Sequence, residues 1–596
     1  MSVVLKIKEV TAVAINQLYG IDLLPVDILV NATKPEFEGD YTVVLFAFIK
    51  QLKKSPDALG QELGDHITTE NQHLFTSFNV IKGFLNLTVA DNYWLHFIGD
   101  QYKNISFGCA PANGQKVMVE YSSPNTNKPL HLGHLRNNFL GRSIAEILKA
   151  NGNEVIKTCI VNDRGIHICK SMIAWEMFAN GATPASTHTK GDHFVGDYYV
   201  KFNDEYKKEI DVLKTQGKTQ EEAEKEAPVM KATQQMLLDW EAGKPSVMEL
   251  WSRMNSWVYE GFDATYKRIG SDFDKTYYES NTYLLGKDLV ETGLAKGVFF
   301  QKTDGSVWID LTADGLDEKL VRRKDGTSVY ITQDIGLAEQ KQKEFNAGQS
   351  IYVVGDEQNY HFKVLKLICQ KLGLPSADGM YHLSYGMVEL PTGKMKSREG
   401  TVVDADDLVD EMINIAKQKT EELGKVKDFT SQELEELYNT IGLGALKFFL
   451  LRVDPKKKMV FNPEESIDFH GFTGPFIQYT HARIKSILRK SGTIQKQETG
   501  NEQLGTALLP LEKELAIHLE MFPVILNDAA TEHDPSKVAI YIFNLAKIFN
   551  SFYTEHSIGN AETEEKKILR LQLSQLTAQV IKTGMNVLGI NVPERM

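Results

Sequence analysis

The sequence predicts a multidomain α/β protein whose largest domain is built on a parallel sheet with a helical insertion. Three observations predict it. The chain of 596 residues is long enough for about four domains of ordinary size. Strand-like and helix-like segments alternate between about residues 113 and 470, and strand signals end beyond about residue 471. We therefore expect a small α+β domain at 1–112, a parallel-sheet domain at 113–470 and an all-α domain at 471–596.

Composition excludes several classes of protein. Apolar residues make up 42% and charged residues 24%, as in ordinary globular proteins. There is no run of about 18 apolar residues and no signal-peptide pattern, so no membrane partner is expected. The four cysteines lie far apart without CxxC spacing, which fits a reducing cytoplasm and disfavours a zinc ribbon. The net charge of −13 excludes a bulk coat for DNA or RNA but allows a local basic groove.

The first part of the chain mixes helix and strand patterns. Residues 3–20 carry apolar residues at helical spacing and end on a glycine, which predicts an amphipathic helix. Residues 36–55 are expected to form a turn that enters a second helix, and residues 83–102 a strand followed by a helix. The segment 107–116 contains two glycines and a proline, and is a plausible linker.

The middle part carries two strand–helix–strand patterns. A strand is expected at 116–123, a helix at 131–152 closed by Asn151-Gly152, and a nearly continuous apolar strand at 154–163. The pattern returns as a strand at 349–358, a helix at 360–373 and a strand at 380–390. Such units predict a Rossmann-type sheet with both faces covered. The stretch from about 180 to 290 is rich in charged residues at helical spacing, so we expect a solvated helical insertion.

The last part shows only helical periodicity. Amphipathic patterns cover 474–492, 516–530, 537–556 and 568–589. This predicts an all-helical domain.

The segment 122–138, SSPNTNKPLHLGHLRNN, joins the first strand of the parallel sheet to its first helix. Open parallel sheets bind ligands at that place, and a helix N-terminus there presents free N–H groups to a phosphate. Gly133 would let a nucleotide approach the backbone, and His131 and His134 can donate hydrogen bonds to phosphate oxygens. The alternative is a pair of histidines that only caps the helix.

The segment 391–403, PTGKMKSREGTVV, is a basic loop flanked by glycines. Its Lys394, Lys396, Ser397 and Arg398 are suited to stabilising charge on a triphosphate. The alternative is an ordinary basic surface loop. The prediction depends on the HLGH segment in the other half of the same domain.

HLGH followed by KMKS resembles the HIGH and KMSKS pair of class I aminoacyl-tRNA synthetases. The extended HLGH region and several other segments, in the same order, resemble the arginyl-tRNA synthetase family in particular. They are DGTSVYITQDIG, VVGDEQNYHF, LSYGMV, GKMKSREGTVV, GPFIQYTHAR and LGINVPERM, with EFEGDYTVVLFAFIK and GFLNLTV nearer the start. The resemblance covers nearly the whole chain.

The resemblance implies a site for L-arginine. A guanidinium is a planar fork of donors that a carboxylate can meet with two hydrogen bonds, and Asp334 matches the family's carboxylate. Tyr330, one helical turn earlier, would pack on the substrate side chain. Asn125 and Gln358 are assigned to the α-amino and carboxylate end. The remaining members, at the rim of the pocket, are Glu120 and Ser123. Without the resemblance, Asp334 would be taken as a surface carboxylate.

The resemblance also implies a site for ATP with Mg²⁺, without a tightly bound metal. Its catalytic members are expected to be Lys128, His131, His134, Lys394 and Lys396. ATP contacts are also expected from Gly133, Gly386, Met387, Met395 and Ser397. Arg398 stands where the general class I pattern has its second lysine. Many family members with this departure carry a lysine just before the first histidine, and we expect Lys128 to contact a phosphate instead.

The last domain resembles the anticodon-binding domain of the family, and the first resembles one that contacts the tRNA elbow. Bases of an anticodon loop can stack on aromatic side chains. The expected contacts are Phe476, Tyr479, His481, Arg483, Asn544 and Met596, with Tyr541 and Phe549 as further candidates. The alternative for each aromatic residue is a place in the core. The family precedent predicts a monomer.

The expected function is activation of L-arginine by ATP and transfer to the 3′ end of tRNA(Arg). Three alternatives stay open. A nucleotidylyltransferase can carry HxGH but needs neither the first nor the last domain. A non-catalytic tRNA-binding paralogue would be expected to have lost His131, His134, Asp334 or Gln358, and all four are present. A synthetase for another amino acid is distinguished by the pair Tyr330 and Asp334.

Overall fold

The computed structural model describes residues 2–34, 36–389, 391, 403–422, 424, 428–491 and 507–596. The N-terminal unit is a four-stranded antiparallel sheet in the order β1-β2-β4-β3. Its strands are β1 (Val30–Ala32), β2 (Tyr41–Val44), β3 (Phe75–Ile81) and β4 (Phe84–Val89), and its helices are α1 (Val3–Tyr19), α2 (Phe46–Leu52) and α3 (Pro56–Glu70).

One expectation for this unit was incomplete. Residues 36–55 were expected to be a turn and a helix, but strand β2 precedes α2. The strand is short and nearly all buried, so it lacks the alternation that identifies a half-exposed strand. Helix α3 packs closely against β3 at Gly64. A Cβ atom at this position would come within 2.2 Å of the Phe78 ring, so only glycine allows this approach.

The central sheet is parallel throughout, as expected. Its order is β12-β11-β5-β6-β7. The strands are β5 (Lys116–Glu120), β6 (Glu154–Val161), β7 (Lys275–Tyr278), β11 (Gln349–Gly355) and β12 (Met380–Tyr385). Helix α5 (Leu132–Ala150) links β5 to β6, α14 (Tyr330–Phe345) precedes β11, and α15 (Asn359–Leu372) links β11 to β12. The chain order reverses between β5 and β11, and ligands bind at such a switch point.

The helical insertion is present, but it begins and ends earlier in the chain than the expected range of about 180–290. Helices fill most of it: α6 (Ile166–Phe178), α7 (Pro184–Thr187), α8 (Gly191–Thr215), α9 (Gln220–Glu226), α10 (Pro228–Glu241) and α11 (Pro245–Ile269). The expected range of 180–290 is wrong at its end, because β7 within it is a strand of the central sheet. Four residues between helices give too short a pattern to identify a strand.

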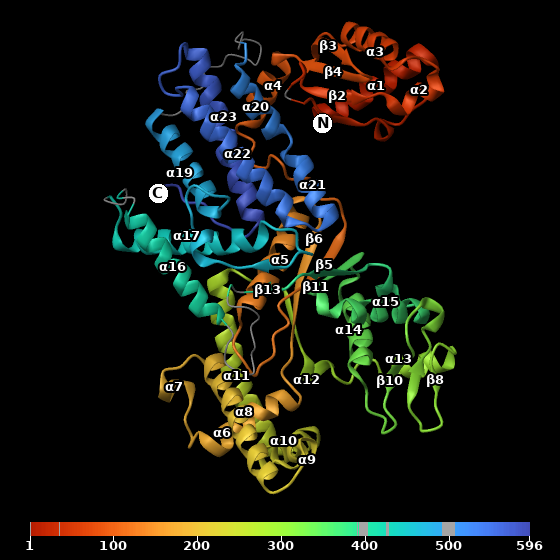
Figure 1. Ribbon diagram of the computed structural model, residues 1–596, viewed down its shortest axis with the longest axis vertical. Coiled ribbons are helices and arrows are strands. Elements are labelled where there is room, and N and C mark those ends of the chain that lie inside the picture. Colours follow the sequence, from red (N-terminus) through yellow and green to blue (C-terminus); the bar gives the residue numbers. More distant parts are fainter. Residues whose placement is uncertain are drawn as a thin grey trace.

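A second small unit follows β7. It consists of α12 (Glu279–Thr282), α13 (Lys287–Ala295) and an antiparallel sheet of β8 (Phe300–Gln301), β9 (Val307–Ile309) and β10 (Lys319–Arg322). In Figure 1 this unit lies at the lower right, while the insertion helices α6 to α11 lie at the bottom. Short 3-10 helices lie at Pro25–Asp27, Thr312–Asp314, Asp356–Gln358 and Pro375–Ala377.

The described residues of 471–596 are helical, as predicted, but the run of helices already begins at residue 405, inside the part expected to belong to the parallel-sheet domain. Strands β13 (Val388–Glu389) and β14 (Met459–Val460) pair with each other, and the helices between and after them form a bundle that packs on α5. The helices are α16 (Ala405–Glu422), α17 (Ser431–Leu451), α18 (Pro463–Ser466), α19 (Gly474–Ser491), α20 (Pro510–Glu520), α21 (Phe522–Glu532), α22 (Pro535–Glu555) and α23 (Glu564–Val587).

The N-terminal unit is attached through α4 (Asp91–Gln101), which packs against α20 and α23. Figure 1 shows this unit at the upper right, beside the C-terminal helices. Among the described helices, none combines the length and the apolar character that a membrane crossing needs.

Candidate active site

The two histidines of HLGH form the first turn of α5. His131 is the N-cap residue in an extended conformation, and its Nδ1 accepts the Gly133 N–H at 3.1 Å. The Nδ1 of His134 accepts the His131 N–H, also at 3.1 Å. Because each Nδ1 is an acceptor, the proton of each neutral ring is on Nε2. The histidines thus cap the helix, and they also present two N–H donors beyond it.

Burial keeps both rings neutral. Desolvation, followed by the charge of Lys128, lowers the pKa of His131 to about 3. Burial also lowers the pKa of His134, with His131 and Lys128 acting in the same direction. Lys128 is therefore close enough for its charge to act at this helix start. A Cβ atom at Gly133 would lie 3.0 Å from Cε1 of His131, so a larger residue would displace that ring.

The chain between β5 and α5 is strained and tightly held. Ser122 and Ser123 have φ values of 79° and 49°, which non-glycine residues rarely adopt. Asn137 of α5 accepts the Ser122 N–H at 2.5 Å and donates to the Val353 carbonyl at 2.7 Å. This side chain thus joins β5 to β11 at the switch point. It was missed in the sequence because a polar residue in a helix suggests a solvated face.

Arg136 is a second residue that was missed in the sequence. It is fully buried and donates to the carbonyls of Pro455 at 3.1 Å and Lys457 at 2.8 Å. A Cβ atom at Gly386 would lie 2.6 Å from the Lys457 carbonyl carbon, so the chain at Gly386 rests on this segment. Met387 follows, and its Sδ is 3.8 Å from where a Cβ of Gly355 would be. The expected ATP residues Gly386 and Met387 therefore lie beside the end of β11.

The expected basic loop lies largely outside the described residues, and the part outside includes Lys394, Met395, Lys396, Ser397 and Arg398. The described end of the loop, from residue 403 on, is hydrogen-bonded to the HLGH segment. The Leu132 N–H donates to the Val403 carbonyl at 3.1 Å, and the Ala405 N–H donates to the Leu130 carbonyl at 3.0 Å. Asp404 forms an isolated β-bridge with His131. The HLGH segment and the end of the basic loop are therefore in contact at this point.

Helix α14 presents Tyr330 and Asp334 one turn apart, as expected. The Tyr330 side chain is exposed, and the Asp334 carboxylate lies 2.7 Å from Nε2 of His361. Gln358 ends a 3-10 helix just beyond β11 and is exposed. Asn125 is exposed and forms a β-bridge to Asn162 beyond the end of β6.

Glu279, the first residue of α12, is a carboxylate that was missed in the sequence. Burial raises the pKa of Glu279 to about 7. The charge of Arg164 lowers this pKa, and the charges of Asp163 and Asp334 raise it further. The effect of Asp334 on this pKa means that the two carboxylates are close enough for their charges to interact. The residue was missed because the strand before it, β7, was not recognised.

Glu120 does not offer a free carboxylate. It ends β5, is buried, and forms an ion pair with the buried Lys341 of α14. Nζ of Lys341 also lies 5.3 Å from the ring centroids of both Tyr277 and Tyr352. Ser123, also expected at the rim, is half-buried, and its carbonyl accepts from Asn162 at 3.4 Å.

The expected RNA residues differ in exposure. Tyr479 and Arg483 are half-buried on α19, with the guanidinium 4.9 Å from the ring centroid. Asn544 is exposed, and Met596 and Phe476 are half-buried. His481 is buried and bonds to the Pro593 carbonyl at 2.9 Å, so its expected RNA contact is not supported. The further candidates Tyr541 and Phe549 are core residues.

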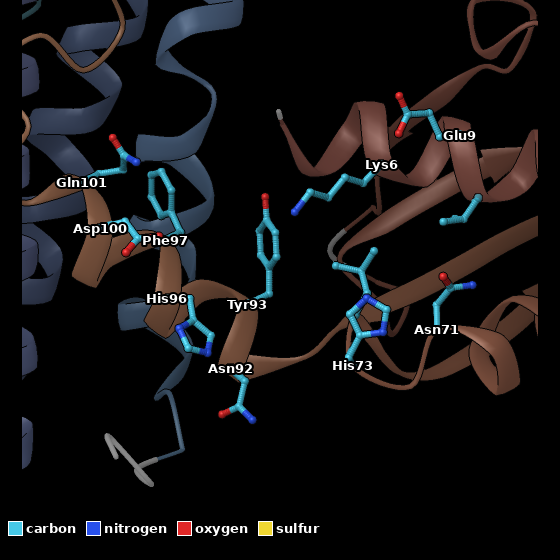
Figure 2. A pocket seen from close by; sticks show the side chains of 12 residues that line it. Lys6, Glu9, Asn71, His73, Asn92, Tyr93, His96, Phe97, Asp100 and Gln101 are labelled. Carbon is cyan, nitrogen blue, oxygen red and sulfur yellow. The ribbon is translucent and has the colours of Figure 1, made fainter. Parts of the chain in front are cut away.

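A cavity of about 670 Å³ lies elsewhere, between the N-terminal unit and α4 (Figure 2). Lys6 and Tyr93 lie side by side in its lining, with Nζ 4.8 Å from the ring centroid. It contains none of the residues expected to bind arginine or ATP, so its volume does not identify the site.

Three family models match the chain. The model described as tRNA synthetases class I (R), catalytic domain, matches residues 101–462. The DALR anticodon binding domain matches 477–596, and the arginyl tRNA synthetase N terminal domain matches 5–89.

Relatives match over nearly the whole length. Arginine–tRNA ligase of Flavobacterium psychrophilum is 54% identical and covers 98% of each chain. That of Amoebophilus asiaticus is 52% identical over 100% of each chain. The solved arginyl-tRNA synthetase of Thermus thermophilus has a TM-score of 0.77 at 25% identity, covering 99% of each chain. With such relatives and a catalytic-domain model that matches more than half of its residues, the chain belongs to the arginyl-tRNA synthetases of class I.

Proposed function

We propose that the chain activates L-arginine with ATP at the start of α5 and then transfers the arginyl group to the 3′ end of tRNA(Arg). Its membership of the family makes it an arginine–tRNA ligase. The observation that carries the assignment of the site is the pair of neutral histidines, His131 and His134, at the switch point of a parallel sheet. The individual residues around this pair have distinct roles in the two steps.

In the first step a carboxylate oxygen of arginine attacks the α-phosphorus of ATP. The bond to the bridging oxygen breaks, and pyrophosphate leaves with its electron pair. His131 and His134 donate from Nε2 to phosphate oxygens, which stabilises the charge that develops in the transition state. Lys128, Lys394 and Lys396 add positive charge along the triphosphate. The enzyme otherwise acts by aligning the two reactants.

Mg²⁺ accompanies ATP and supplies charge neutralisation at the phosphates. The described residues at the start of α5 are neutral histidines and a lysine, which suits a metal carried by the nucleotide rather than one held by a protein cage. Gly133, Gly386, Met387, Met395 and Ser397 are the further residues assigned to the nucleotide.

The arginine side chain is assigned to the space between Asp334 and Glu279. Both carboxylates can accept from the fork of guanidinium donors, and a bound guanidinium would favour the ionised form of Glu279, whose pKa burial raises in its absence. Tyr330 packs on the methylene groups. Asn125, Ser123 and Gln358 serve the polar end of the substrate, and Glu120 supports the pocket through its ion pair with Lys341.

The tRNA is assigned to both outer domains. Phe476, Tyr479, Arg483, Asn544 and Met596 are assigned to the anticodon side, and the N-terminal unit to the elbow. The proposed boundaries are 1–112, 113–470 and 471–596, and the proposed state is a monomer in the cytoplasm.

The test is ATP–pyrophosphate exchange with each amino acid in turn, with and without total tRNA. Arginine alone is expected to support exchange. Asp334→Asn and Glu279→Gln should each raise the arginine KM by about 100-fold or more, because a matched polar contact with the guanidinium is lost. Asp317→Asn is the matched control, since this carboxylate is 84% exposed.

Two outcomes would contradict the proposal. Exchange with another amino acid would refute the pocket. Tight tRNA binding without exchange for any amino acid would favour the non-catalytic paralogue.

A further inference from the structure

Helix α8 of the insertion contacts both signature segments with its first turns. A Cβ atom at Gly196 would lie 2.8 Å from Cδ of Pro129 and 3.6 Å from Cα of Lys128, so the helix lies against the chain just before His131. On the other side, Lys190 and His193 face the carboxylates that directly follow the basic loop. One helix start therefore lies between the two segments.

The contacts on the loop side are ionic. Nζ of Lys190 lies 2.7 Å from Asp406 Oδ2 and 3.0 Å from Asp192 Oδ2. Nε2 of His193 lies 3.3 Å from Asp404 Oδ2 and 3.5 Å from Asp406 Oδ2. From α11, Thr265 donates to Asp406 at 3.1 Å.

The two oxygens of Asp404 have separate partners. Oδ1 accepts the N–H groups of Asp406 at 2.8 Å and Asp407 at 3.2 Å, and so caps the start of α16. Oδ2 faces His193 and accepts no hydrogen bond within the described part of the chain. The backbone of Asp404 pairs with that of His131. The imidazole of His193 is therefore connected to the HLGH turn through Asp404 alone.

The group is a charge network rather than a metal site. Asp192, His193 and Asp406 bring ligand atoms within 4.8 Å of one another. The ammonium of Lys190, however, contacts both carboxylates. It therefore already occupies the position between them that a metal ion would need.

We propose that His193 is a positioning residue for adenylate formation: as an imidazolium it holds Asp404 and Asp406, and thereby keeps residues 403–404 paired with the HLGH turn. The insertion thus helps to set where His131 and His134 meet ATP. This inference rests on the role proposed above for these two histidines.

The neighbours of His193 determine its response to pH. The carboxylate of Asp406 raises its pKa above the usual value, opposed by burial and Lys190 and helped by Asp404 and Asp192. Asp197 faces it from its own helix, and Arg268 of α11 lies 3.9 Å from Asp406. Because the folded pKa of His193 is raised, the ion pair is present below that pKa while the carboxylates stay ionised, and it is lost as the pH rises through that pKa. Burial raises the pKa of Asp404, so this carboxylate is the first to leave the pair in acid.

The experiment compares His193→Gln with His193→Lys, which keeps a positive charge, and with His188→Gln at an exposed site of the same insertion. Exchange is measured with arginine and tRNA from pH 6 to 9. At pH 6.5, His193→Gln should raise the ATP KM about tenfold, because the positive charge that attracts Asp404 and Asp406 is lost. The arginine KM should change by no more than about twofold, because the lost interaction affects the binding of ATP and not that of arginine.

The difference from wild type should vanish by pH 9, and His193→Lys should restore the ATP KM and remove its pH dependence. An equal effect at pH 6.5 and 9, an unchanged ATP KM, or failure of a folded lysine variant to rescue would each overturn the inference. His131→Gln separates the two proposals: if it leaves exchange intact, the proposed site itself is wrong. If it abolishes exchange while His193→Gln has no effect, only the positioning role fails.

Discussion

His131 combines structure and chemistry in one side chain. Its Nδ1 caps α5, and its buried ring stays neutral because its pKa falls from 6.5 to about 3. In the unfolded chain the same ring takes up a proton below about pH 6.5, so folding stability must decrease as the pH falls. The limiting slope for one such group is about 1.4 kcal/mol per pH unit.

We therefore expect the thermal midpoint of the wild type to fall from pH 7 to pH 5, and His131→Gln to fall less steeply. The exposed His188→Gln should keep the wild-type slope. Equal slopes for all three proteins would show that the His131 ring is protonated in the folded state.

At the scale of single residues, the resemblance to the family carried more of the site than the pattern did. Tyr330 and Asp334 were assigned to the site through that resemblance, and the helical period adds only that the two residues share one face. Arg136 and Asn137 were not found, because in a sequence they resemble a solvated helix face, and only packing shows that they reach the carbonyls of distant segments. His481 was assigned to RNA, but it is buried against the C-terminal segment.

Helix α5 holds the parts of the site together as a single element. Its first turn carries the two histidines, Asn137 reaches β11, and Arg136 reaches the segment at 455–457. Replacing Arg136 by Met leaves buried carbonyls without donors, at about 1–3 kcal/mol for each unpaired group. We expect Arg136→Met to lower the thermal midpoint and raise the ATP KM, as measured by thermal unfolding and exchange kinetics.

Lys149→Met is the control on the same helix, because its ion pair with Glu146 is on the surface. If both variants behaved alike, the helix would be stabilised by packing alone.

Length alone did not decide which elements were predicted, since the seven-residue β3 was not recognised while the five-residue β5 was. The long helices and the apolar strands of the central sheet show clear periods. Strands β2 and β7 have four residues each, and both were missed. The second omission had a consequence for the site, since Glu279 follows β7 directly.

At the scale of the whole molecule, one lysine fastens the first domain to the last. Lys513 of α20 lies 2.8 Å from Asp40, 3.1 Å from the Val89 carbonyl and 3.9 Å from Asp91. Lys513→Met should loosen this docking and raise the tRNA KM by about fivefold, within the usual range of coupling between distant sites. The arginine and ATP KM values should not change.

Aminoacylation kinetics with varied tRNA measure this effect. Lys537→Met on α22 serves as the control, because its pair with Glu532 is within the C-terminal helices. A similar rise in the arginine KM would indicate that the contact between the first and last domains also affects the arginine site of the catalytic domain.

The order of strands in the central sheet has a consequence for how the chain is made. Strand β5 ends at residue 120 and pairs with β11, which starts at residue 349. At a synthesis rate of about 5–20 residues per second, β5 waits about 10–50 s with one open edge before its neighbour emerges. The insertion helices, whose contacts are local, can form during this interval. Assembly of the sheet is therefore expected to be the slow step of folding, and the open edge of β5 the place where a chaperone protects the nascent chain.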